Sequence, residues 1–162
     1  MNRPSALNRL KEMRDFGGAA ITRGLSDEII VDFLQESSDL AVAIERGYDA
    51  FLALTKSHVD FLSLDESEQI RKSQGGLTNF YATESVSPYV AVAAAGPWIV
   101  TLKGAVIYDC GGYGMLGFGH APAAVLDAMN KTHVMANVMT PSINQFDFTE
   151  RLRQEIGHTR PE

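Results

Sequence analysis

The sequence predicts an α+β fold, because its hydrophobic pattern changes from helical to strand-like near Pro97. Before that residue, apolar side chains recur every three or four positions, which places them on one face of a helix. After it, residues 98–102 and 105–108 form short runs rich in β-branched and aromatic residues. Lys103-Gly104 between them suits the turn of a small β-hairpin. A glycine-rich loop and two further helices are expected to follow.

Composition limits the classes of protein to which the chain can belong. Its 162 residues fit one domain or a piece of a larger protein, and 45% hydrophobic with 21% charged residues is ordinary for a globular fold. A net charge of -6 argues against a nucleic-acid partner, since phosphate contacts need a basic surplus. The longest apolar run, residues 90–95, is too short to cross a membrane, and the N-terminus lacks the apolar core of a signal peptide. With Cys110 as the only cysteine, we expect a cytoplasmic protein without disulfides.

The first half of the chain divides into two predicted parts. Residues 1–25 show no hydrophobic period and are punctuated by glycines, so we expect a mobile arm. Residues 26–85 are expected to form a helical N-terminal extension, with Ser26 as the N-cap of its first helix. Its three helices are predicted over residues 26–35, 38–57 and 65–72.

The second half is expected to carry two more helices after the hairpin. Pro122 suits the first turn of a helix that continues to about Lys131. Ser142 and Gln145 match a capping box, which predicts a helix over residues 142–156. Because this helix and the helix over 38–57 each carry a hydrophobic stripe, we expect the isolated chain to self-associate. The residues expected to be buried on association include Phe51, Met135 and Phe148.

Five glycines fall within residues 111–119, which indicates a loop with unusual backbone angles or a close approach to another group. Gly112 to Gly117 formally matches the dinucleotide-binding pattern G-x-G-x-x-G. That mechanism needs a helix beginning at the last glycine, whereas the helix signal comes later, at Pro122. The acidic residue expected about twenty positions further on is also missing, since residues 128–132 contain none. The loop either folds tightly without a ligand or lines an active site.

Single residues near this loop have competing interpretations. His120 has no partner at metal-ligand spacing, so a local hydrogen bond that shapes the end of the loop is favoured over acid–base chemistry. Cys110 is better explained as a small buried residue than as a nucleophile. Tyr108 is expected to be a buried strand residue. Tyr113 and Phe118 either pack within the loop or present an aromatic face to a substrate.

Three segments together resemble a run near the start of class III pyridoxal-phosphate aminotransferases. They are Ala95-Gly-Pro-Trp-Ile-Val100, Lys103-Gly-Ala-Val-Ile-Tyr-Asp109 and Gly117-Phe-Gly-His-Ala-Pro122. In that family a small hairpin precedes a glycine-containing loop, which is followed by Gly-His-x-Pro and a helix. The resemblance spans about residues 92–131 and continues toward Glu162. It implies that residues 86–162 are the N-terminal segment of such an enzyme.

The resemblance implies a fold-type I enzyme that works as a homodimer, with active sites at the subunit interface. Pyridoxal phosphate would be held as a Schiff base on a lysine, and an amino group would move from an amine or amino acid to a 2-oxo acid. By the same resemblance, one set of loop residues lines the substrate entrance and none binds the cofactor. That set is Gly111, Gly112, Tyr113, Gly114, Phe118, Gly119 and His120.

Several functional residues of the family have no counterpart in this chain. The phosphate-binding Ser-Gly-Ser/Thr motif, the aspartate that pairs with the pyridine nitrogen and the Schiff-base lysine are not found. Lys103 is expected in an exposed turn, where neither desolvation nor charge would activate it. We therefore expect a chain that stops before the cofactor-binding large domain and is not catalytic alone. The alternatives are a non-catalytic interaction module, a truncated pseudoenzyme, or an independent small-ligand binder that uses the glycine loop.

Overall fold

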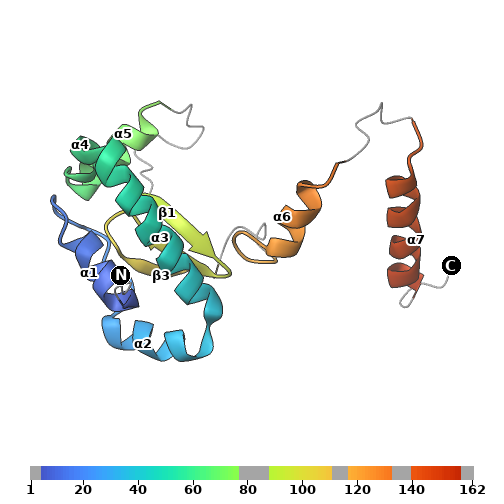
Figure 1. The fold of residues 1–162 in the computed structure, drawn as a ribbon, viewed down its shortest axis with the longest axis horizontal. Coiled ribbons are helices and arrows are strands. Elements are labelled where there is room, and N and C mark those ends of the chain that lie inside the picture. Colours follow the sequence, from blue (N-terminus) through green and yellow to red (C-terminus); the bar gives the residue numbers. More distant parts are fainter. Residues whose placement is uncertain (1–4, 77–87, 111–116, 133–139, 158–162) are drawn as a thin grey trace. The chain divides into compact units, whose positions relative to one another are not determined.

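The computed structural model describes residues 5–76, 88–110, 117–132 and 140–157 (Figure 1). Within these residues the chain is an α+β protein with seven helices and a three-stranded antiparallel sheet, which confirms the predicted class. It divides into two compact units, residues 1–122 and 123–162. The expected boundary between residues 85 and 86 is wrong, because helices before it and strands after it share one core.

Five helices belong to the N-terminal unit. Three were predicted from the sequence and are confirmed to within two residues at each end. The side chain of Ser26 accepts a hydrogen bond from the backbone N–H of Ile29, so the predicted N-cap is also confirmed. The bounds are α1 Ala6–Arg14, α2 Asp27–Glu36, α3 Ser38–Ser57, α4 Val59–Leu62 and α5 Glu66–Gln74.

The sheet runs in the order β1-β2-β3, with strands Ala91–Ala95, Trp98–Thr101 and Val106–Tyr108. The predicted hairpin is confirmed as the β2-β3 pair, in which Trp98 lies opposite Tyr108. Gly104 occupies the turn with a φ of 72°, a conformation that favours glycine. Strand β1 was not predicted, because four of its five residues are alanines and give no β-branched signal.

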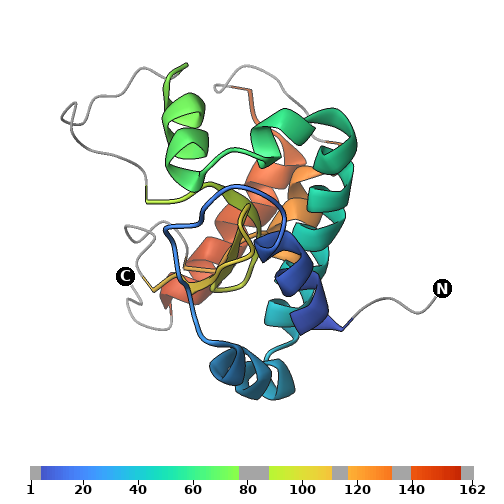
Figure 2. The same ribbon diagram turned by 90° about the vertical axis from the view of Figure 1, so that its left-hand side faces the viewer.

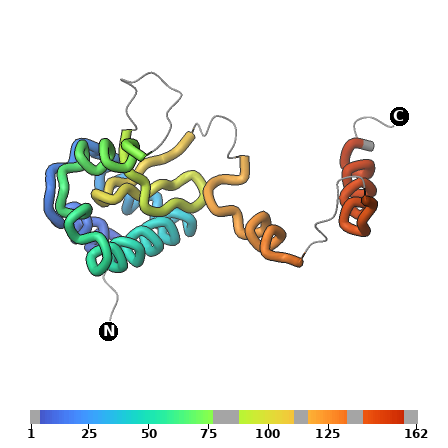
Figure 3. Tube along the Cα trace, turned by 90° about the horizontal axis from the view of Figure 1, so that it is seen from above, coloured from blue at the N-terminus to red at the C-terminus, as the bar shows by residue number. Residues whose placement is uncertain are grey.

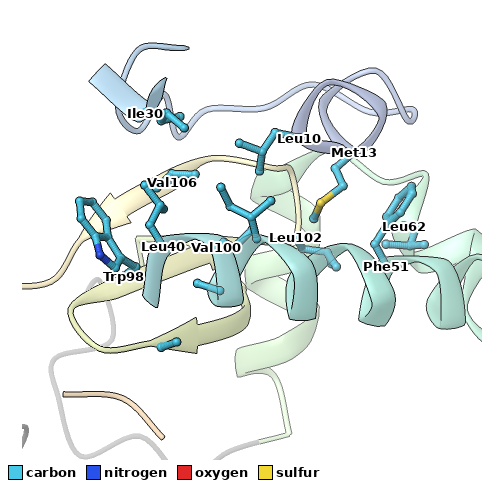
Figure 4. Packing of buried hydrophobic residues seen from close by; sticks show 13 residues of the cluster. Leu10, Met13, Ile30, Leu40, Phe51, Leu62, Trp98, Val100, Leu102 and Val106 are labelled. Carbon is cyan, nitrogen blue, oxygen red and sulfur yellow. The ribbon is translucent and has the colours of Figure 1, made fainter. Parts of the chain in front are cut away.

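Helix α3 lies along the sheet and contributes much of the core (Figures 2 and 3). Leu40 and Phe51 on its buried face are at most 2% exposed, and Val100 of β2 is fully buried (Figure 4). A Cβ atom on Gly47 would lie 3.0 Å from Val100 Cγ1, so the glycine lets the helix approach the strand closely. Phe51 is therefore a core residue of the unit, and the expectation that it drives self-association is wrong.

The expectation that residues 1–25 form a mobile arm is wrong. Helix α1 occupies part of that stretch and buries Leu10 and Met13 in the core, where they are at most 1% exposed (Figure 4). Only one helical turn separates these two apolar residues, which is too short a pattern to stand out in the sequence. The segment after α1 is also fixed, because the backbone N–H of Leu25 donates to the carbonyl of Val106 at 2.8 Å.

The C-terminal unit contains α6, Ala123–Met129, and α7, Ile143–Gly157. Both helices were predicted. The N-cap of α7 is confirmed by a 3.2 Å hydrogen bond from the backbone N–H of Gln145 to Ser142 Oγ. Phe148 is 65% exposed, as expected of an unpaired stripe, and Met135 lies outside the described residues. Self-association through α7 stays a prediction. Among the described residues, no helix is both long and apolar enough to span a bilayer.

Candidate functional site

The candidate entrance residues are described only in part. Gly111, Gly112, Tyr113 and Gly114 lie outside the described residues, whereas Phe118, Gly119 and His120 lie within them. Phe118 is 83% exposed, which argues against the interpretation that this ring packs within the loop. Whether it contacts a substrate stays a prediction.

A pair of backbone hydrogen bonds joins two of the three segments that carry the aminotransferase resemblance. The N–H of His120 donates to the carbonyl of Gly96 at 2.7 Å, and the N–H of Gly96 donates to the carbonyl of His120 at 3.1 Å. The chain thus returns from the glycine loop to the turn between β1 and β2.

Glycine is required on both sides of this bridge. Gly119 has a φ of 74°, and a Cβ atom there would lie 2.8 Å from the Cα of Gly96, closer than real side chains come. Gly96 has a φ of 51°, and a Cβ atom there would collide with the carboxylate of Asp39. Both residues have a left-handed backbone conformation and no room for a side chain. Steric hindrance therefore explains why these two positions are glycines.

His120 and Asp109 form a side-chain pair beside the bridge. Nε2 of His120 lies 3.0 Å from Oδ2 of Asp109, and each side chain is about one-fifth exposed. The position of Asp109 is set by its backbone N–H, which donates to the carbonyl of Pro97 at 2.7 Å. The predicted local hydrogen bond of His120 is therefore confirmed. An aspartate bonded to one imidazole nitrogen fixes the ring orientation and leaves the other nitrogen for a second partner.

These residues surround a hollow of about 340 Å³, which we call the His120 hollow. Its volume is in the range of sites for small molecules. The described residues that line it include two carboxylates and one imidazole, and none of these described residues is lysine or arginine. It is lined by Asp39, Gly96, Pro97, Asp109, Gly117, Phe118, Gly119 and His120. Among the described residues, no group of three His, Cys, Asp or Glu side chains could hold a metal ion.

Sequence reasoning missed one of the hollow's residues, Asp39. Asp39 is exposed on α3, and its carboxylate also lies against Gly96. The only signal for this contact was the Gly96-Pro97 pair before the hairpin, which marks a turn without saying what packs against it.

Two other expectations near the site are wrong. Cys110 is exposed, not buried, because it follows the last residues of the sheet. Tyr108 is 49% exposed, since it ends the edge strand β3. One face of its ring still packs edge-on against Trp98, with 5.0 Å between ring centroids.

Lys103 is buried, which contradicts the expectation of an exposed turn. It is 2% exposed, and its Nζ donates to the carbonyls of Gly17 at 2.6 Å and Leu62 at 3.1 Å. Burial lowers the pKa of this amine, while the carboxylates of Asp65 and Glu66 act in the opposite direction. The turn is polar in sequence, but the chain after α1 and helix α4 cover it.

Pyridoxal phosphate does not fit the described residues as a complete site. Lys103 is the one buried lysine among them, and its amine is already held by two backbone carbonyls. The remaining lysines, Lys11, Lys56, Lys72 and Lys131, are exposed and lack the desolvation that an amine nucleophile needs near neutral pH. Whether this chain supplies the cofactor lysine stays a prediction.

Comparison with known proteins found no family model that matches the chain, and no curated protein or solved structure similar to it. The relationship to aminotransferases therefore stays a prediction from the three motif segments.

Proposed function

We propose that this chain is the N-terminal part of a class III pyridoxal-phosphate aminotransferase of fold type I. The enzyme would move an amino group from an amine or amino acid to a 2-oxo acid, as a cytoplasmic homodimer. In this proposal residues 117–120 border the substrate entrance. The observation that carries the proposal is the backbone bridge between Gly96 and His120.

The bridge supports the proposal because one backbone contact explains why glycines stand in two of the three motif segments. Gly96 belongs to the first motif segment, and Gly119 with His120 belongs to the third. A chance match of glycines in a flexible loop would not require two left-handed residues in steric contact. The order of hairpin, loop and helix also agrees with the order that the resemblance implies.

The cofactor would supply the electron sink that stabilises negative charge on the substrate carbon. The residues of this chain would act further out, where the hollow could hold the part of the substrate remote from the reacting carbon. Lys103 has no role in this proposal, since its amine donates hydrogen bonds to two backbone carbonyls and so stabilises the turn between β2 and β3.

A non-catalytic interaction module is the second candidate, and one observation favours it. Helix α7 exposes several large apolar side chains that a partner could cover. They are Ile143, Phe146, Phe148, Leu152 and Ile156. A truncated pseudoenzyme would share this property.

The proposed function is tested on the polypeptide as cells produce it. It would be isolated with an antibody raised against this chain, and its cofactor and amino-transfer activity measured. We expect pyridoxal phosphate in stoichiometric amount and transfer to a 2-oxo acid; a cofactor-free, inactive polypeptide would overturn the proposal. As a control, the 162-residue chain alone would be treated with the cofactor and borohydride. We expect no lysine to be labelled stoichiometrically.

A further inference from the structure

Three buried polar side chains meet beneath the turn between β2 and β3. Glu66 and Gln69 lie three positions apart on α5, so they share one face of that helix. They are 1% and 0% exposed, and Lys103 of the turn is 2% exposed. Lys103 Nζ and Gln69 Nε2 both donate to the carbonyl of Leu62, each at 3.1 Å. The ammonium and the side-chain amide therefore lie against the same carbonyl oxygen.

The amide of Gln69 has one buried acceptor left over. Its Nε2 donates to the carbonyls of Phe61 at 3.0 Å and Leu62 at 3.1 Å, which uses both of its N–H groups. A reversed amide would place its oxygen against these two carbonyl oxygens, so the orientation of the side chain is fixed. Its Oε1 is buried and accepts no hydrogen bond from the described residues. Buried acceptors are normally paired, so this oxygen needs a donor.

The carboxylate of Glu66 is likewise only half used. Its Oε2 accepts from the backbone N–H groups of Ile21 and Thr22, each at 2.7 Å. Its Oε1 is buried and accepts nothing from the described residues. The carboxylate acts on the charge of Lys103, yet no ion pair at contact distance joins these two described residues. Opposite charges that interact without direct contact are commonly bridged by water.

The donors and acceptors that remain define the ligand. The ammonium of Lys103 has three hydrogens, and the carbonyls of Gly17 and Leu62 take two of them. One donor and two acceptors are then left over, and a water molecule, which can accept one bond and donate two, has the complementary set. A metal ion would be repelled by the ammonium charge, and an anion would meet two oxygen acceptors, so neither fits.

We propose that a buried water molecule bridges Lys103, Glu66 and Gln69, accepting a hydrogen bond from Nζ and donating to the two Oε1 atoms. About three hydrogen bonds are typical of a buried water in a protein. The water completes the polar cluster and connects α5 to the turn between β2 and β3. This site is independent of the proposed aminotransferase function, because all of its residues lie outside the His120 hollow.

A crystal structure of the full 162-residue chain, at a resolution that shows ordered waters, tests the bridge directly. We expect one water within hydrogen-bonding distance of Lys103 Nζ, Glu66 Oε1 and Gln69 Oε1. Three results would overturn the inference: direct contact between Nζ and Glu66 Oε1, a contact between the two Oε1 atoms that requires a shared proton, or no water at this position.

Oxygen-17 relaxation dispersion, which counts long-lived internal waters, tests the same site in solution. Gln69→Met removes one of the two acceptors with a side chain of similar size, so the variant should lose the signal of one long-lived water. The matched control is Gln35→Met, the same replacement at an exposed position of α2, and it should lose none. Equal counts in wild type and Gln69→Met, or an equal loss in the control, would overturn the inference. The crystal structure needs no variant, so it decides the question where Gln69→Met does not fold.

Discussion

Nζ of Lys103 lies 2.6 Å from the carbonyl oxygen of Gly17, a residue 86 positions earlier in the chain. The same amine donates to Leu62 at 3.1 Å, so one side chain joins the hairpin turn to the segment after α1 and to α4. Glu66 lies close enough to act on the charge of this amine. It is itself only 1% exposed. A buried polar cluster at the end of the sheet thus stabilises the N-terminal unit.

Replacing Lys103 with methionine should change how stability depends on pH. Burial holds the pKa of Lys103 below its ordinary value of 10.5, so the unfolded chain binds more protons between the two pKa values. Wild-type stability should therefore gain a positive contribution from this residue as pH rises through that window. Urea unfolding across the alkaline range should show the contribution in wild type and not in Lys103→Met. An identical slope in both proteins would contradict the buried position of the charge.

The same variant should be less stable than wild type near neutral pH. The carbonyls of Gly17 and Leu62 would lose their donor, which costs about 1–3 kcal/mol when the acceptors stay buried. The variant also loses the desolvation cost of the buried ammonium group, and this gain offsets part of the loss.

Gly119→Ala should break the bridge between the glycine loop and the sheet. The left-handed φ of 74° and the 2.8 Å approach to Gly96 together should cost about 2–3 kcal/mol of unfolding free energy. Gly117→Ala is the matched control, because a Cβ atom there would meet nothing within 4 Å. It should stay within about 0.5 kcal/mol of wild type. Equal effects of the two alanines would contradict the bridge.

Ser37→Ala should destabilise the unit more than a simple cap removal. Ser37 Oγ accepts from the backbone N–H of Leu40 at 3.4 Å and from Trp98 Nε1 at 2.9 Å. Losing both bonds should cost about 2 kcal/mol. Ser26→Ala, which removes the cap of α2 and a side-chain hydrogen bond to the exposed Glu28, should cost about 1 kcal/mol. Chemical denaturation measures both. A cost for Ser37→Ala no larger than that for Ser26→Ala would show that the Trp98 bond contributes nothing.

Glu66→Gln should loosen the segment after α1. One carboxylate oxygen of Glu66 accepts from the N–H groups of both Ile21 and Thr22 at 2.7 Å. A neutral amide is a weaker acceptor, so amide hydrogen exchange at these two residues should accelerate by roughly tenfold. Glu68→Gln, on the exposed face of the same helix, should leave their exchange unchanged. Unchanged exchange in both variants would show that the carboxylate charge does not hold this segment.

The parts of the fold that were predictable are those with a long local signal. Helix α3 shows its stripe over 20 residues, and the β2-β3 hairpin has both strand residues and a turn glycine. Helix α1 buries only two residues at one-turn spacing, and β1 consists mainly of alanine. Their positions depend on tertiary packing, which local propensity does not record.

The candidate site was predictable to a similar extent. His120 and Gly119 stood out through their glycine neighbours and the motif that contains them. The carboxylate of Asp39 reaches the site only because α3 lies along the sheet, and the burial of Lys103 depends on the chain after α1 covering the turn. Both are contacts between segments distant in sequence, and no local pattern encodes them.

The aminotransferase assignment is tested most directly by sequencing the transcript beyond the codon for Glu162. We expect the reading frame to stay open and to encode Ser-Gly-Ser or Ser-Gly-Thr within a few tens of residues, with a candidate Schiff-base lysine further on. A frame that closes without this phosphate-binding motif would contradict the assignment and favour a self-sufficient module.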